Sequence, residues 1–179
     1  MGFKLVDDYG HMWEYDENDA VGNTSESIFE VTWTKSSGHW IWMMYHRNAY
    51  RPDDSYSWVK WITPSRDLIA AYEDEGDTER ASASIIYDEC GWENYYPKDS
   101  YAFMHKCPTN ASSIILMRLG EIYLLHAEAL AMTGNLAKAT EYVNILRNRA
   151  GIKEIRQPAS EEEMIDAILH ERRLELAFE

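Results

Sequence analysis

The chain has 179 residues, enough for one domain with its own hydrophobic core. Its 45% hydrophobic and 27% charged residues are typical of a folded protein and argue against disorder throughout. The net charge of −14, from 31 acidic and 17 basic side chains, repels phosphate backbones and argues against nucleic acid as a partner. No apolar run approaches the roughly 20 residues that span a bilayer, and the start, MGFKLVDDYG, lacks the apolar core of a signal peptide.

The first 110 residues predict short extended pieces separated by loops. Residues 27–34, SIFEVTWT, alternate and predict a half-buried strand whose apolar face holds Phe29, Val31 and Trp33. Residues 63–76 predict a short helix with Thr63 as N-cap and Pro64 in its first position. We expect a turn and a strand over residues 77–87, and a loop over residues 88–110.

From residue 114 the pattern changes to helix. One apolar stripe predicts a first helix up to Gly134; it consists of Leu116, Leu119, Tyr123, Ala127 and Leu130. Asn135 can cap a second helix, which Gly151 closes. Ser160 and Glu163 form a capping box for a third helix, which has no stop signal before the end of the sequence.

The first two of these helices resemble a tetratricopeptide repeat (TPR). Ala127, Gly134, Ala139 and Val143 fall where that repeat needs small residues, a turn glycine and a bulky residue. We therefore predict a mainly α fold, a TPR-like helical repeat of the α-α superhelix type. A long, irregular, aromatic-rich loop region with short strands accompanies it. The predicted division is 1–110 for the irregular region and 111–179 for the helical region, truncated at its C-terminal end.

Aromatic residues are the unusual part of the composition, with seven Trp and 12 Tyr against four Phe. Rings with a polar group suit half-wet surfaces that bind a ligand, although the same rings can also complete a core. The loop over residues 39–58 combines ring faces with polar side chains, as sugar binding requires. We predict a ligand site there, made by Trp40, Trp42, Tyr45, Arg47, Asn48, Tyr50, Tyr56 and Trp58. A second candidate platform consists of Trp92, Tyr95 and Tyr96.

Charged residues of the helices invite a catalytic interpretation, which we weigh against a structural one. The residues are Arg118, Glu121, Glu128, Glu171, Arg172 and Arg173. Paired carboxylates serve glycosidases as acid and base, but helix charges three or four residues apart more often form ion pairs. We expect these residues to hold the fold together and predict no catalytic residue.

Metal and redox chemistry find little support. Cys90 and Cys107 fit one disulfide or two thiols, without a CxxC pattern. The six histidines show no HExxH spacing. The acidic stretches DENDA and RPDDS could hold calcium, but solvated turns explain them better. We predict no metal and no cofactor.

Several blocks resemble, in order, the SusD/RagB family of Bacteroidota. Residues 114–152, IILMRLGEIYLLHAEALAMTGNLAKATEYVNILRNRAGI, and residues 160–179, SEEEMIDAILHERRLELAFE, are the most similar. In the first block, Arg118, Glu121, Ala127 and Glu128 match family positions, and its ending matches through Asn144, Arg147, Arg149, Ala150 and Gly151. Upstream, residues 25–33, SESIFEVTW, and residues 63–80, TPSRDLIAAYEDEGDTER, also match, with Thr78 and Glu79 in place of the usual proline.

The resemblance implies a surface-exposed outer-membrane lipoprotein that captures oligosaccharides and delivers them to a SusC-type TonB-dependent transporter. It implies a binding protein, not an enzyme. Family members are longer and begin with a lipidated cysteine that is not present here, so we expect a partial chain. The alternatives are a helical-repeat scaffold that binds protein without binding glycan, and an acidic carbohydrate-active enzyme.

Overall fold

The computed structural model describes residues 2–14, 22–44, 47, 62–91 and 93–179. The described residues form two 3₁₀ helices, η1 (Tyr9–Trp13) and η2 (Ile41–Met44), four strands and five α-helices. The strands are β1 (Ser27–Val31), β2 (Ile85–Asp88), β3 (Tyr101–Met104) and β4 (Ile114–Arg118), and the helices are α1 (Arg66–Glu75), α2 (Thr78–Ser84), α3 (Leu119–Met132), α4 (Leu136–Arg149) and α5 (Glu161–Glu175). The described chain is thus mainly helical with short strands, as predicted. Each of its helices is too short or too polar to span a membrane.

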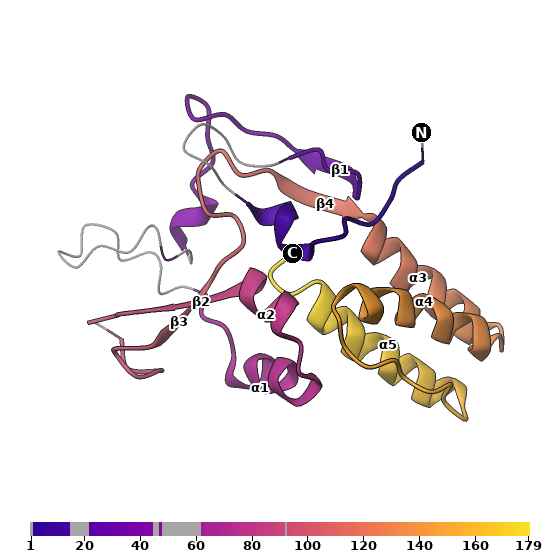
Figure 1. Ribbon diagram of the computed structural model, residues 1–179. Helices are drawn as coiled ribbons and strands as arrows, with labels where there is room; N and C mark the ends of the chain where they lie inside the picture. Colours follow the sequence, from indigo (N-terminus) through magenta and orange to yellow (C-terminus); the bar gives the residue numbers. More distant parts are fainter. Residues whose placement is uncertain (1, 15–21, 45–46, 48–61, 92) are drawn as a thin grey trace.

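Helices α3, α4 and α5 form one side of the molecule, and the β2–β3 hairpin forms the other, with α1 and α2 between them (Figure 1). Ala127 of α3 and Ala139 of α4 are fully buried, so the two helices pack closely. Met164 and Ile168 of α5 close the same core. The turn between α3 and α4 uses Gly134, whose φ of 82° favours glycine.

The predicted helix caps are confirmed in α4 and α5. The side chain of Asn135 accepts a hydrogen bond from the Lys138 N–H, 3.3 Å away. Ser160 likewise accepts from the N–H of Glu163 at 3.2 Å. The Glu163 carboxylate accepts from the N–H of Ala159, one residue before the cap.

The predicted start of the first long helix at residue 114 was wrong. Residues 114–118 form β4, which pairs antiparallel with β1, so that Arg118 lies opposite Ser27. Pairing with a distant strand overrides the helical spacing of the apolar residues here. The predicted buried face of β1 was wrong too, because Phe29 is 59% exposed and Val31 37% exposed. The register of β1 shifts on both sides of Phe29, which breaks the alternation that the sequence suggests.

Three further local predictions were wrong. Helix α1 begins two residues later than expected, because Ser65 and not Thr63 caps it by accepting from the Leu68 N–H at 3.1 Å. Residues 78–84 form α2, which the side chain of Asp77 caps, where we expected a turn. Residues 101–104 form β3, paired with β2, where we expected loop.

Helix α5 does not run to the end of the sequence. It ends at Glu175, and Phe178 follows with a φ of 67°. This turn brings the carboxylate of Glu179 back to Arg118 and Lys106, with N–O distances of 2.7 Å to each. The last residues therefore pack into the molecule.

Candidate functional site

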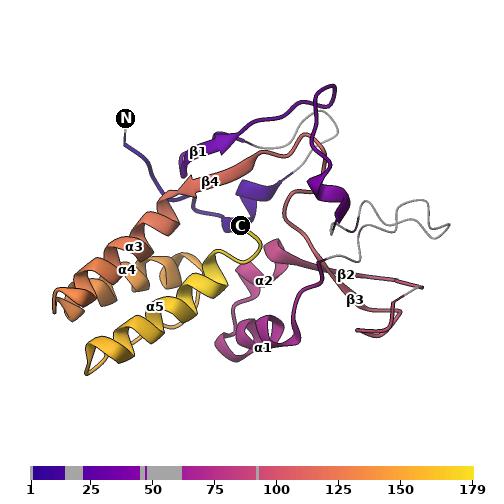
Figure 2. The same ribbon diagram turned by 180° about the vertical axis from the view of Figure 1, so that it is seen from behind.

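A cluster of aromatic side chains lies at the β2–β3 hairpin. Its buried centre consists of Cys90, Tyr101 and Phe103, and half-buried side chains pack around it, including Trp42 and Tyr96. Trp42 comes from helix η2 and packs against this cluster. We call these residues the aromatic cluster. Figure 2 shows the β2–β3 hairpin on the side of the molecule opposite α3, α4 and α5.

Tyrosine hydroxyls tie the aromatic cluster to the segment before α1. The Tyr96 hydroxyl donates to the carbonyl oxygen of Pro64 at 2.8 Å, and the Tyr101 hydroxyl lies 3.2 Å from the Thr63 hydroxyl. Burial raises the pKa of Tyr96 to about 12 and also raises the pKa of Tyr101. Both hydroxyls therefore stay protonated at neutral pH.

Two exposed rings sit next to anchored ones. Trp40, 60% exposed, precedes the packed Trp42 by two residues, and Tyr95, 43% exposed, directly precedes the packed Tyr96. The guanidinium of Arg66 stacks over the Tyr95 ring, 4.3 Å from its centroid, and donates to the Tyr95 carbonyl oxygen. Arg66 contacts Tyr95, and Trp40 is linked to them only through Trp42 and the aromatic cluster; we call these three exposed residues the aromatic surface.

His39 fixes the backbone from which Trp40 projects. Its Nδ1 accepts from the N–H of Ile41 at 3.2 Å, which leaves Nε2 as the donor to the carbonyl oxygen of Ser112 at 3.0 Å. Burial lowers the pKa of His39, so the neutral ring with this tautomer is favoured. The Met43 N–H donates to the Trp40 carbonyl oxygen at 3.0 Å and continues the turn.

Three of the eight predicted ligand residues lie within the described part of the chain. Trp40 is exposed, Trp42 packs into the aromatic cluster, and Arg47 forms an ion pair with Asp88 of β2. The N–H of Glu89 and then Arg47 lower the pKa of Asp88. The other predicted residues lie outside the described residues; they are Tyr45, Asn48, Tyr50, Tyr56 and Trp58, and Trp92 of the second platform.

The sequence reasoning missed Arg66, because only the folded chain brings α1 against residues 95 and 96. The acidic stretches DENDA and RPDDS both lie outside the described residues, so the possibility that they hold calcium stays untested. Within the described ranges, no group of three or more potential ligands is placed to hold a metal ion. Cys90 and Cys107 are both buried, and no disulfide joins them.

The charged residues singled out in the helices mostly form ion pairs. Arg172 pairs with Glu121 at 2.8 Å, and Arg173 pairs with Asp67. Glu171 accepts from Arg80 at 2.6 Å and from Arg147 at 2.9 Å, in a fully buried position. The expectation that these residues hold the fold together agrees with this geometry.

A second buried group surrounds Glu175, which accepts from Arg118 at 2.6 Å and from Arg149. Arg118 also donates to Glu26 at 2.7 Å, so β4, α4, α5 and the segment before β1 meet at one point. Burial raises the pKa of Glu175, but the neighbouring arginines lower it more, and the carboxyl stays ionised. We call the residues around Glu171 and Glu175 the ion-pair network.

Comparisons with known proteins place this fold. Residues 106–179 match the model of the SusD family. A SusD-like protein from Bacteroides fragilis NCTC 9343 is 21% identical, with a TM-score of 0.74, over 99% of this chain and 46% of that one. A SusD superfamily protein from Bacteroides vulgatus ATCC 8482 is 22% identical, with a TM-score of 0.70, over 97% and 41%.

A third similar structure is the surface glycan-binding protein A from Bacteroides thetaiotaomicron, 17% identical, with a TM-score of 0.68, over 97% of this chain and 43% of that one. This chain therefore spans less than half of the length of each of these proteins. Comparison with curated protein sequences finds no match. The resemblance to the SusD/RagB family that the sequence indicated is confirmed.

Proposed function

Because residues 106–179 and the fold make this chain a relative of the SusD family, we propose that it is a binding protein that captures glycans on its aromatic surface. The observation that carries the proposal is the pair of exposed rings, Trp40 and Tyr95, each next to a ring anchored in the aromatic cluster. Sugar rings present apolar C–H faces edged by hydroxyls, and an exposed ring held by a rigid neighbour matches such a face. Arg66, over the ring of Tyr95, supplies polar groups beside it.

The proposal extends to the partners and location that the resemblance implies. The bound oligosaccharide would pass to a SusC-type TonB-dependent transporter at the cell outer membrane, with the protein exposed at the surface and held by a lipid anchor. We also propose that α3 and α4 are one TPR-like unit of the scaffold, and that residues 1–110 and 111–179 divide ligand contact from scaffold. The surface glycan-binding protein among the similar structures supports the first step of this proposal, the capture of a glycan.

The runner-up is a helical scaffold that binds protein and no glycan. Exposed apolar side chains on the long helices favour it: Leu125 is 44% exposed, Met132 65% and Ile145 40%. Such a scaffold would not depend on the exposed aromatic rings near the hairpin. A change of Trp40 alone should therefore weaken glycan binding and leave protein binding unchanged.

Native affinity electrophoresis in gels that contain soluble polysaccharides tests the proposal. We expect the mobility of the wild-type chain to fall in at least one gel and that of the Trp40→Ala variant to recover. A Phe29→Ala variant, which removes a ring that is 59% exposed on β1, is the matched control. Unchanged mobility of the wild type in every gel, or retardation equal in both variants, would contradict the proposal. Release of sugar fragments during the run would point to an enzyme instead.

A further inference from the structure

A groove with mostly apolar walls lies between α1, α2 and β2, which are neighbours in Figure 1. It has a volume of about 510 Å³. Tyr72 and Ile85 reach it from the buried core, while the half-buried Ile69 and Ala81 and the exposed Tyr87 line it nearer to the surface. We call this the α1–β2 groove. The proposed glycan binding does not use it.

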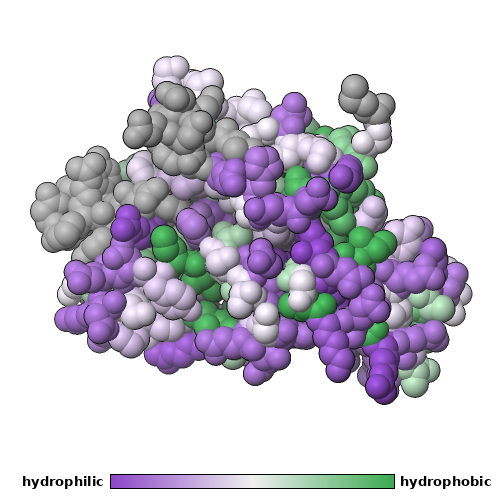
Figure 3. Space-filling model, viewed as in Figure 1, coloured by the Kyte–Doolittle hydropathy of each residue, from purple (hydrophilic) through white to green (hydrophobic). Residues whose placement is uncertain are grey.

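The walls of the α1–β2 groove suit aliphatic side chains. On the face that Figure 3 shows, hydrophilic residues predominate and hydrophobic residues are exposed in small patches. The ring of Tyr87 is 51% exposed and stands beside Ile69 and Ala81 in the groove. An occupant with aliphatic side chains would remove this apolar area from water. A sugar, which carries hydroxyls around its ring, would find few polar partners here.

The free charge of the α1–β2 groove is negative. Glu73 is exposed and forms no ion pair with any other described residue, whereas Asp77 is buried against Arg80 at 2.5 Å. Burial and then the charge of Glu73 raise the pKa of Tyr87, so this carboxylate acts across the groove. Glu73 also belongs to the last turn of α1, which contains no basic residue and is the negative end of the helix dipole. The groove therefore favours a cationic group beside Glu73.

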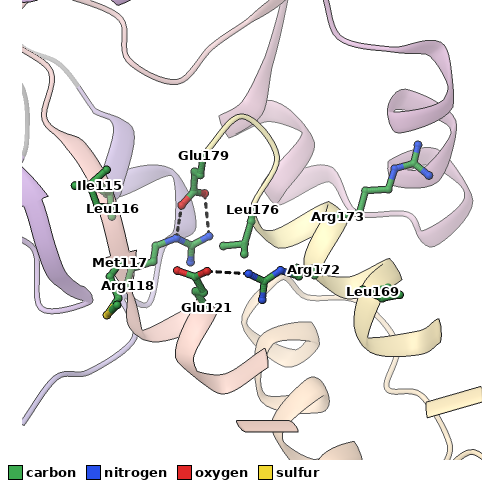
Figure 4. A pocket seen from close by; sticks show the side chains of 10 residues that line it. All are labelled: Ile115, Leu116, Met117, Arg118, Glu121, Leu169, Arg172, Arg173, Leu176 and Glu179. Atoms are coloured by element: carbon green, nitrogen blue, oxygen red, sulfur yellow. Dashed lines mark hydrogen bonds and ion pairs between the residues drawn. The ribbon is translucent and has the colours of Figure 1, made fainter. Parts of the chain in front are cut away.

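The groove between β4 and α5 differs in this respect. Its volume is similar, about 520 Å³. Figure 4 shows that the ion pairs Arg118–Glu179 and Arg172–Glu121 stand between its walls. Its charged side chains are thus already paired, and none of them selects a partner. The α1–β2 groove keeps one carboxylate free beside its apolar walls.

We propose that the α1–β2 groove binds a segment of a partner protein that places aliphatic side chains in the groove and a lysine or arginine beside Glu73. The free carboxylate and the apolar walls complement the two parts of such a segment. A second copy of this chain fits less well, because each copy carries a net charge of −14 and the copies repel. The proposal does not depend on glycan capture, which uses other residues.

Fluorescence anisotropy with a fluorescein-labelled, blocked heptapeptide tests the proposal. The peptide holds two leucines and two lysines between alanines. One counterpart has serines in place of the leucines, and another has glutamines in place of the lysines. We expect the serine peptide to bind at least about tenfold more weakly, because the burial of two leucine side chains is lost. The glutamine peptide should bind about two- to fivefold more weakly, as the loss of an exposed ion pair implies.

Variants of the groove separate this binding from general attraction to an acidic protein. Glu73→Gln should reduce the difference between the lysine and glutamine peptides, and Glu162→Gln, at an exposed glutamate outside the groove, should keep it. Both variants change the net charge by one, so a loss through general attraction would be equal in the two. Tyr87→Ala should weaken binding at least about fivefold, and Tyr87→Phe should not, because the ring forms the wall. Circular dichroism checks that each variant folds.

Amide hydrogen exchange of the complex locates the peptide, and we expect slower exchange at residues 76–82. No binding, equal binding of the leucine and serine peptides, equal losses for Glu73→Gln and Glu162→Gln, or slowing confined to other elements would overturn the proposal. Slowing that rises with protein concentration and needs no peptide would assign the groove to a second copy and overturn it as well. Release of the peptide by a soluble glycan would assign the groove to glycan capture, with the same consequence.

Discussion

Neighbouring tryptophans in this chain have opposite environments. Trp42 packs on the buried centre of the aromatic cluster, whereas Trp40 is 60% exposed. Burial of apolar area stabilises the fold, and an exposed ring contributes little to it. In the sequence both residues are aromatic rings in a segment that also contains Gly and Pro. Only the fold shows that Trp42 packs into the core and that Trp40 is exposed to solvent.

We expect Trp42→Ala to lower the free energy of unfolding by about 1–3 kcal/mol, less than the roughly 3–5 kcal/mol of a fully buried tryptophan. Trp40→Ala should change it by less than about 0.5 kcal/mol. Urea denaturation followed by far-ultraviolet circular dichroism measures both. Equal losses would show that Trp40 is also a packing residue and would remove the basis of the aromatic surface.

Glu175 makes stability depend on pH. Its lowered pKa keeps it ionised in the folded chain, whereas in the unfolded chain it takes up a proton near its ordinary pKa of 4.5. Its contribution is therefore present above that pH and is lost as the pH falls toward the folded pKa. We expect the free energy of unfolding to fall from about pH 5 downward.

The Glu175→Gln variant is the control for this pH dependence. It removes one of the two buried carboxylates that Arg118 and Arg149 share, the other being Glu26, and should cost about 3 kcal/mol at neutral pH. The free energy of unfolding should also fall less steeply as the pH is lowered. Part of this fall remains, because the pKa values of Glu179 and Glu75 also lie below their usual range. An unchanged slope in urea titrations between about pH 3 and 7 would contradict this role.

At the level of elements, cap residues predicted the structure best. Asn135, Ser160, Gly134 and Gly151 each stand where the sequence expected a helix to begin or end. These signals are local, since each depends on a side chain or a φ within a few residues. Strand β4 could not be predicted in the same way, because its apolar spacing also suits a helix and its partner β1 lies more than 80 residues earlier in the chain.

The turn between α3 and α4 gives an element-scale prediction. Gly134 has a φ of 82°, and no atom lies within 4 Å of an added Cβ, so the cost of Gly134→Ala comes from the backbone alone. We expect a loss of roughly 1–2 kcal/mol. Gly2→Ala, also in open space but without a positive φ, is the matched control and should be neutral by thermal denaturation. Equal midpoints for the two variants would show that the turn tolerates a side chain.

At the scale of the whole molecule, the ion-pair network joins the two predicted regions. Arg118 binds Glu26, and Glu171 binds Arg80, so ion pairs cross the predicted boundary at residue 110 at several points. That boundary stays a prediction. The sequence indicated the charged residues and their structural role, but partners such as Arg80 and Glu26 come from remote segments that no periodicity connects.

The aromatic surface was predicted in part for the same reason. A high content of Trp and Tyr indicated ligand binding and named Trp40 and Tyr95, while Arg66 reaches Tyr95 only after α1 packs beside the hairpin. Residue types in a loop can be read from the sequence, but which ring faces solvent depends on contacts made across the fold.

Titration of the ¹⁵N-labelled chain with soluble glycans, followed through the seven tryptophan indole N–H signals in ¹H–¹⁵N spectra, tests the glycan proposal most directly. The Trp40→Phe variant assigns the signal of Trp40. We predict that this signal shifts in a saturable way with at least one glycan and that the signal of Trp13, which packs in a separate cluster, stays in place. Saturable shifts that spare Trp40, or no shift with any glycan, would contradict glycan capture by the aromatic surface.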